Sequence, residues 1–165
     1  MIRMTDSIYI EAPVEKVFDY YKDPAHWEEI APAWLHTEYT NITRKPQIKG
    51  TTFDTYGKVP GLPPMRGSAE FVDAEPNRRL VLRGDTGFGM ETTTFLFEPA
   101  GSGMVLTVLD EREKLAAERV PLVGRIAEWV VDQLGVQWMH VLKAKMEDKK
   151  REDTKGEGKA HKPSV

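Results

Sequence analysis

The chain has 165 residues, no cysteine and a formal net charge of −3 at pH 7. This length suits one domain with its own hydrophobic core, and the lack of cysteine excludes disulfides and thiolate chemistry. The weakly acidic charge excludes the basic surface typical of a nucleic-acid-binding protein. No apolar run approaches the ~18 residues that a membrane span requires, and the first residues lack the apolar core of a signal peptide. We therefore expect one soluble cytoplasmic domain, monomeric or homodimeric, without a nucleic-acid partner.

The first part of the chain predicts one strand and two short helices. Residues 7–11 alternate between apolar and polar side chains and are rich in β formers, which indicates a strand. Apolar residues at helical spacing follow Pro13, which suits the first turn of a helix. Asp23 and Pro24 end this helix. A second short helix is expected over residues 25–30.

The middle of the chain predicts six further strands. Short β-rich segments alternate with turn signals, and the proline-rich segment 60–64 is excluded from any hydrogen-bonded ladder. Strands at this short spacing favour an antiparallel sheet over βαβ units. The expected strands cover residues 34–42, 51–58, 65–74, 79–84, 91–98 and 104–111.

The C-terminal part predicts one long helix followed by a tail. From residue 120, apolar side chains recur at steps of three and four, which defines one helical face. Residues 149–165 are mostly charged, with no apolar period, and bury too little apolar surface to offset the entropy of ordering. We therefore expect a folded domain over residues 1–148 and a disordered charged tail over 149–165.

Several local motifs in this order resemble the SRPBCC, or START/Bet v 1-like, superfamily. The motifs are residues 8–18, Asp23-Pro24 followed by Trp27, Gly50-Thr51, residues 71–76 followed by Arg79-Leu80, and residues 95–99 followed by 101–103. The resemblance covers about residues 7–146. Within the superfamily, residues 32–35 and 61–66 look most like polyketide cyclase/dehydrase-type and hydrophobic-ligand-binding members.

The resemblance implies an α+β helix-grip fold. In such a fold a seven-stranded curved antiparallel sheet wraps around the long C-terminal helix, with two short helices after the first strand. A hydrophobic pocket lies between the sheet and the helix. Functions in the superfamily range from lipid transport to aromatase/cyclase chemistry, so the fold does not choose among them.

Strand parity predicts which side chains face this pocket. The inward set starts from Phe71, and the apolar face of the helix closes the trough. Gly67 and Ala69 are treated as positions where a bulkier residue fits equally well, so that they leave room in the pocket unless Trp138 fills it. The predicted ligand-binding residues are Leu35, Thr37, Tyr39, Phe53, Thr55, Gly67, Ala69, Phe71, Leu82, Thr93, Phe95, Phe97, Leu106 and Val108 from the sheet, and Ala127, Val130, Leu134 and Trp138 from the helix.

No catalytic constellation is evident in the sequence. The four histidines are dispersed and no cysteine accompanies them, so no metal site is expected. There is no nucleophile elbow and no dinucleotide-binding fingerprint, so no cofactor is expected. The candidates for proton transfer are Asp110, which shares a face with Val108, and Tyr39 and Arg66. The alternative for Asp110 is a rim carboxylate paired with Arg66, Arg83 or Arg112.

Three functions remain open at this point. The first is binding of a small apolar molecule without chemistry, and the second is aromatase/cyclase or dehydratase activity on a polyketide in the same cavity. The third is a solid structural module, since protein interiors usually pack to a density near ~0.75. A cavity of roughly several hundred Å³ would exclude the third, and two or more titratable groups inside it would favour the second. We expect a cavity with few such groups.

Overall fold

The computed structural model describes residues 1–85, 89–113 and 121–159. The predicted order of elements is confirmed, and most boundaries differ from the predicted ones by three residues or fewer. The first strand differs more, because it begins at Ile2 and pairs along its whole length with the last strand. The elements are β1 (Ile2–Ile10), α1 (Val14–Tyr21), the 3₁₀ helix η1 (Pro24–Ile30), β2 (His36–Thr43), β3 (Thr52–Lys58), β4 (Met65–Glu75), β5 (Arg79–Asp85), β6 (Met90–Ala100), β7 (Gly103–Arg112) and α2 (Pro121–Lys159).

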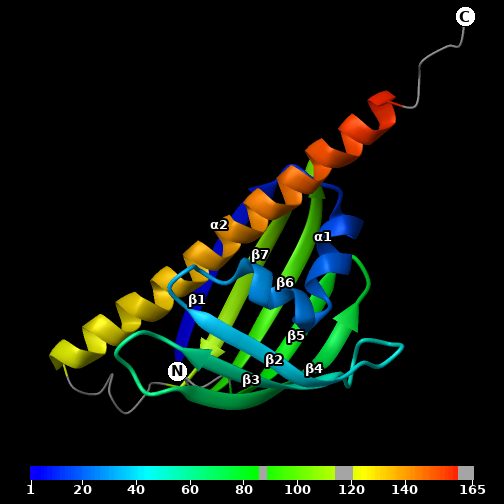
Figure 1. Cartoon of the computed structure of the whole chain (residues 1–165). Coiled ribbons are helices and arrows are strands. Elements are labelled where there is room, and N and C mark those ends of the chain that lie inside the picture. The colour runs from blue at the N-terminus through cyan, green and yellow to red at the C-terminus, as the bar shows by residue number, and fades with distance from the viewer. Residues whose placement is uncertain (86–88, 114–120, 160–165) are drawn as a thin grey trace, which may run out of the picture.

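The seven strands form one sheet in the order β1-β7-β6-β5-β4-β3-β2. All neighbouring strands are antiparallel, as predicted. The register shifts between Thr40 and Thr43 of β2 and between Phe71 and Asp73 of β4. Such bulges bend a strand and increase its twist. The resulting sheet is curved, and its hollow face is turned toward the helices (Figure 1).

The two short helices connect β1 to β2 and cover one end of the hollow face. Pro13 has extended backbone and immediately precedes α1. The side chain of Asp23 caps η1 by accepting a hydrogen bond of 3.1 Å from the amide of Ala25, and Pro24 occupies the first helical position. The buried side of α1 is packed onto the sheet, where the ring of Phe18 meets Phe97 edge-on at 5.2 Å between centroids.

Helix α2 runs diagonally across the hollow face, and both of its ends extend past the sheet (Figure 1). Its buried residues include Leu134, Met139, Leu142 and Met146. Among the described residues, α2 contacts mainly β1 and η1. The predicted helix-grip arrangement, with a long C-terminal helix against a curved antiparallel sheet, is therefore confirmed.

The end of α2 differs from the sequence-based expectation. Residues 149–159 continue the helix to Lys159 instead of leaving it. Lysine, arginine and glutamate are good helix formers, so the helix can extend past Met146, the last residue that we find buried. Residues 160–165 lie outside the described residues. Among the helices that the structure describes, none is long and apolar enough to cross a membrane.

The small residues of β4 also have another role than the one expected. A Cβ atom at Gly67 would lie 1.8 Å from the backbone oxygen of Asp85 on β5. A Cβ atom at Gly84 would lie 2.7 Å from the Cβ of Ala69. The expectation that a bulkier residue fits equally well is therefore wrong for Gly67, because β4 and β5 approach too closely there for a side chain.

Candidate ligand pocket

A pocket of about 230 Å³ lies between the hollow face of the sheet, η1 and α2. Strand parity identifies much of its wall. The predicted residues that line it are Leu35, Thr37, Tyr39, Phe53, Thr55, Leu82, Thr93, Phe95 and Val108 from the sheet side and Leu134 and Trp138 from α2. The sequence pattern thus places these side chains on the correct face of their elements.

Other predicted residues share that face but do not line the pocket. Phe71, Phe97 and Leu106 are almost fully buried in the core, toward the end of the sheet that α1 and η1 cover. Alternation along a strand reports the face of a side chain and not its depth along the trough. Gly67, Ala69 and Val130 are also absent from the lining, and the side chain of Ala127 lies outside the described residues.

The side of α2 that faces the pocket is rotated from the predicted one. Val131, Asp132, Gly135 and Met139 line the pocket together with the predicted Leu134 and Trp138, whereas the predicted Val130 does not. The apolar period of a helix marks a broad stripe, and the sequence did not show which edge of that stripe meets the cavity.

The remaining lining residues were missed by the sequence analysis. Met4 and Asp6 belong to the early part of β1 that was not predicted as strand. Glu91 has the parity of Thr93 and could have been found by the same rule that found Thr93. The other missed residues are Tyr21 of α1, Trp27 of η1, and Tyr56, Gly57 and Met65 of the β3–β4 hairpin.

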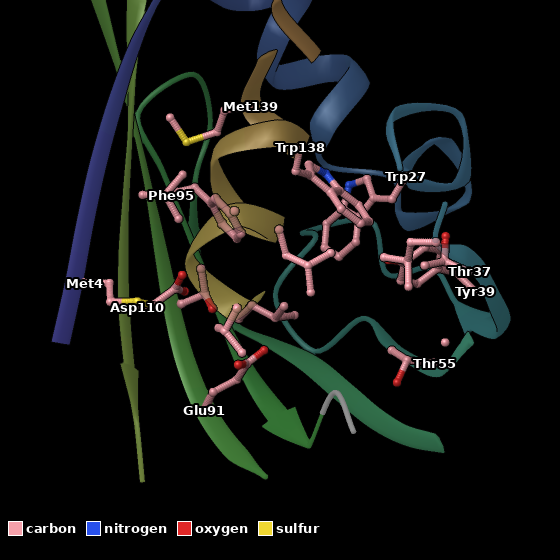
Figure 2. A pocket seen from close by; sticks show the side chains of 18 of the residues that line it. Met4, Trp27, Thr37, Tyr39, Thr55, Glu91, Phe95, Asp110, Trp138 and Met139 are labelled. Carbon is pink, nitrogen blue, oxygen red and sulfur yellow. The ribbon is translucent and has the colours of Figure 1, made fainter. Parts of the chain in front are cut away.

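Aromatic rings form one side of the pocket. The ring of Trp27 lies edge-on to Tyr39 at 5.4 Å and to Phe53 at 5.5 Å between centroids, and Tyr21 lies 4.8 Å from Phe95. The indole Nε1 of Trp27 donates a 2.8 Å hydrogen bond to the carbonyl of Tyr21, so its polar atom is satisfied within the protein. Figure 2 shows Trp27, Trp138 and Phe95 around the same space.

Carboxylates form another part of the wall. Asp110 of β7 lies across from Met4 of β1 and Thr93 of β6 in the strand register. Glu91 lies two residues before Thr93 on the same face, and Asp6 and Asp132 also line the pocket. In Figure 2, Asp110 and Glu91 lie on one side of the pocket and Thr37, Tyr39 and Thr55 on the other. The pocket therefore holds more titratable groups than the sequence analysis predicts.

The burial of these groups changes their acid–base behaviour. Burial raises the pKa of Asp110, and the negative charge of Asp6 raises it further, while the Thr93 hydroxyl and the Arg112 guanidinium lower it. Burial also raises the pKa of Tyr39 and of Tyr21. Both phenols are therefore neutral hydrogen-bonding groups at neutral pH.

The sequence analysis gave Arg66, Arg83 and Arg112 as candidate partners of Asp110. The guanidinium carbon of Arg66 lies 4.9 Å from the centroid of the Tyr56 ring, and Arg66 does not line the pocket. Arg112 is 2% exposed, lies two residues from Asp110 on the same strand face, and is the guanidinium that acts on the pKa of Asp110. Of the three proposed partners, the charge of Arg112 is the one that this carboxyl senses.

Two residues of the pocket wall, Thr37 and Thr55, each have a buried hydroxyl oxygen without a hydrogen-bond partner among the described residues. The hydroxyl oxygen Oγ1 of Thr55 is buried and makes no hydrogen bond within the described structure. A buried hydroxyl without a partner costs about 1–3 kcal/mol of folding free energy.

Within residues 1–85, 89–113 and 121–159, no group of three or more histidine or acidic side chains could hold a metal ion.

A family model described as polyketide cyclase/dehydrase and lipid transport matches residues 1–147. The chain belongs to this family. The match covers all but the last residue of the predicted domain, residues 1–148. The family description supports a role in hydrophobic-ligand binding or in cyclase chemistry. A comparison with curated proteins gave no significant match.

Solved structures similar to this polyketide cyclase/dehydrase family member share its fold. Protein CV1439 from Chromobacterium violaceum is 16% identical with a TM-score of 0.68, and the match covers 89% of this chain and 99% of that one. Protein Ms6760 from Mycobacterium smegmatis is 14% identical with a TM-score of 0.68, over 89% and 92% of the two chains. The di-domain aromatase/cyclase StfQ from the steffimycin biosynthetic pathway is 17% identical with a TM-score of 0.69, over 90% of this chain and 51% of StfQ.

Proposed function

We propose that this protein binds a small hydrophobic molecule, lipid-like or polyketide-like, in the pocket between the sheet and α2. The observation that carries the proposal is the pocket itself, about 230 Å³ in volume and walled by Trp27, Phe53, Phe95 and Trp138. An apolar cavity of about 150 Å³ is large enough to hold benzene. A substituted aromatic ring or a short branched chain therefore fits the space. A purely structural module would be expected to have a closely packed core without such a pocket.

The driving force for such binding is burial of apolar surface. Each Å² of apolar ligand surface removed from water contributes roughly 25 cal/mol, against which the ligand loses translational and rotational freedom. Three methionines, Met4, Met65 and Met139, also line the pocket. Their unbranched side chains can adjust to ligands of different outline.

Gly135 offers a direct test because it lines the pocket from α2. A Cβ atom built there meets nothing within 4 Å. The variant Gly135→Leu is expected to place its side chain in the pocket and lower the affinity for a small aromatic ligand at least ~10-fold, or ~1.4 kcal/mol. The control Gly135→Ala adds only a methyl group and is expected to keep the affinity within about threefold. It should also stabilise the helix by up to ~1 kcal/mol.

The measurement combines native mass spectrometry of the purified protein with calorimetric titration of propylbenzene. Native mass spectrometry should detect a retained apolar ligand on wild type and on Gly135→Ala, and less or none on Gly135→Leu. Equal affinity of propylbenzene for wild type and Gly135→Leu would show that the ligand binds elsewhere.

The second candidate is aromatase/cyclase or dehydratase activity in the same pocket. Asp110, Glu91 and Tyr39 favour it, because perturbed titratable groups gathered in a pocket are typical of proton-transfer sites. Incubation with a poly-β-ketone thioester should then give a cyclised or dehydrated product by liquid chromatography and mass spectrometry, and Asp110→Asn should slow its formation at least ~100-fold. Recovery of the unchanged thioester would leave ligand binding as the function.

A further inference from the structure

We infer that the side-chain hydrogen bond between Trp34 and Gln137 is a latch that controls how fast a ligand enters and leaves the pocket. The inference rests on the proposed function and deepens it, because it concerns the regulation of the same site. Trp34 belongs to the connector between η1 and β2, residues 31–35, and Gln137 belongs to α2. The indole Nε1 of Trp34 donates a 2.8 Å hydrogen bond to Oε1 of Gln137.

This hydrogen bond joins two borders of the pocket. The residue after Trp34 is Leu35, which lines the pocket at the start of β2. The residue after Gln137 is Trp138, which lines the pocket from α2. Strand β2 is the last strand of the sheet, so this side of the pocket has no further strand beyond it. The bond therefore lies where the edge of the sheet faces the helix.

Packing holds this side of the pocket less firmly than the other sides. Among the described residues, α2 contacts mainly β1 and η1, and β2 is not one of its main contacts. The side chain of Trp34 belongs to a residue that is 36% exposed, so burial in a core does not fix its position. The hydrogen bond to Gln137 therefore has a direct part in holding the connector against the helix.

The connector is built so that it can move as a short unit. The amide of Leu35 donates a 2.9 Å hydrogen bond to the carbonyl of Pro32, which closes a turn that contains Trp34. Both flanks of this turn are fixed without the latch. Pro32 is buried, and the amide of Tyr39 donates a 3.0 Å hydrogen bond to Oε1 of Glu28. Release of Trp34 would thus shift the turn and Leu35 while η1 and the rest of β2 stay in place.

A latch in this position changes rates without changing affinity. Trp34 and Gln137 do not line the pocket themselves, so a ligand inside it does not replace their hydrogen bond. Loss of the bond destabilises the closed state equally with and without ligand, and a change that affects both states equally shifts no binding equilibrium. The barriers to entry and to exit therefore fall by the same amount, as for a loop that gates a site.

Variants of the two partners test the latch with propylbenzene as the ligand. Gln137→Leu removes the acceptor and keeps a good helix former, and Trp34→Phe removes the donor. Each is expected to raise the entry and exit rates, measured by NMR exchange spectroscopy, about fivefold, which corresponds to the loss of one hydrogen bond. The calorimetric dissociation constant should stay within about twofold. The double variant should show no further rise, because both changes remove the same bond.

Two further variants of α2 separate the bond from the packing of the helix. Gln137→Glu keeps an acceptor for the indole N–H and makes the hydrogen bond charge-assisted, so both rates should stay at or below those of wild type. Gln133→Leu is the matched control, because it is the same substitution one turn earlier at a residue that does not line the pocket. It should leave both rates unchanged.

A second measurement needs no ligand. In protein labelled with ¹⁵N at the tryptophan indoles, the indole N–H of Trp34 should exchange with solvent faster in Gln137→Leu than in wild type, and at the wild-type rate in Gln133→Leu. Unchanged propylbenzene rates in Gln137→Leu and Trp34→Phe, or an equal rise in Gln133→Leu, overturn the latch and leave the proposed function standing. Failure of propylbenzene to bind wild type overturns the proposed function, and the latch with it.

Discussion

At the scale of single residues, the carboxyl of Asp110 lowers the stability of the fold and places an acidic group at the pocket wall. Its carboxyl is partly buried at the pocket wall, and the first cause of its raised pKa is that burial. A charge held in such surroundings disfavours the folded state unless a partner compensates it. Residues that serve a binding site often lower stability in this way.

The pH dependence of Asp110→Asn follows from the sign of this shift. Because the folded-state pKa lies above that of the unfolded chain, the native carboxyl holds its proton longer. The stability that the protonated carboxyl gives the folded state is fully present below the ordinary aspartate pKa. It is lost as the pH rises through the raised pKa. At neutral pH, Asp110→Asn is therefore expected to raise Tm by about 2–4 °C, which corresponds to ~1 kcal/mol for a chain of this size.

Thermal unfolding between pH 3.5 and pH 8 measures this effect. The gain in Tm should shrink toward zero at the acidic end, where the native Asp110 is already protonated. Glu70→Gln, which changes an exposed carboxylate on β4, is the control and should show no such trend. A lower Tm for Asp110→Asn at neutral pH would contradict the assignment of Asp110 as a buried, costly charge.

At the scale of elements, α2 is fixed firmly near its C-terminal half and borders the pocket with the half before it. Lys143 Nζ donates a 2.7 Å hydrogen bond to the carbonyl of Tyr9 and lies 2.6 Å from Glu147 Oε1. Glu147 in turn accepts a 3.1 Å hydrogen bond from the amide of Glu11. These bonds join the helix to the end of β1. They therefore hold in place the preceding part of α2, which carries Leu134 and Trp138 of the pocket wall.

Glu147→Gln tests this connection. Lys143, and next the amide of Glu11, hold the pKa of Glu147 below its usual range. The charged form therefore contributes stability above the unfolded-state pKa, and that contribution is lost as the pH falls through the lowered value. The variant should lose up to ~1 kcal/mol at neutral pH, measured by urea unfolding, and less at pH 3.5. A loss that does not depend on pH would point to packing instead of charge.

At the scale of the whole molecule, the sequence predicted the order and pairing of the elements better than the position of each inward side chain along the hollow face of the sheet. The alternation of Thr93 and Phe95 placed both on the pocket wall, but the same rule placed Phe97 there, which lies in the core beneath α1. Whether an inward side chain lines a cavity depends on what α1, η1 and α2 cover, and that is set by tertiary contacts. Trp27 was missed for the same reason, because it reaches the pocket from a short helix.

The extent of the domain is a second property of the whole molecule. We propose that residues 1–148 fold independently of the remaining chain, since Met146 is the last residue found buried on α2. A chain that ends after Asp148 should keep its Tm within about 2 °C, or ~0.5 kcal/mol, and keep its affinity for propylbenzene. A large drop in Tm would show that residues 149–165 contribute to the fold.

The methionines allow the most direct test of the pocket. Met4, Met65 and Met139 line it, whereas Met104 and Met146 are buried in the core away from it. In protein labelled with ¹³C at the methionine methyl groups, titration with propylbenzene should shift the NMR signals of Met4, Met65 and Met139 and leave those of Met104 and Met146 unchanged. Shifts confined to the exposed Met1 and Met90, or no shifts at saturating ligand, would contradict the account.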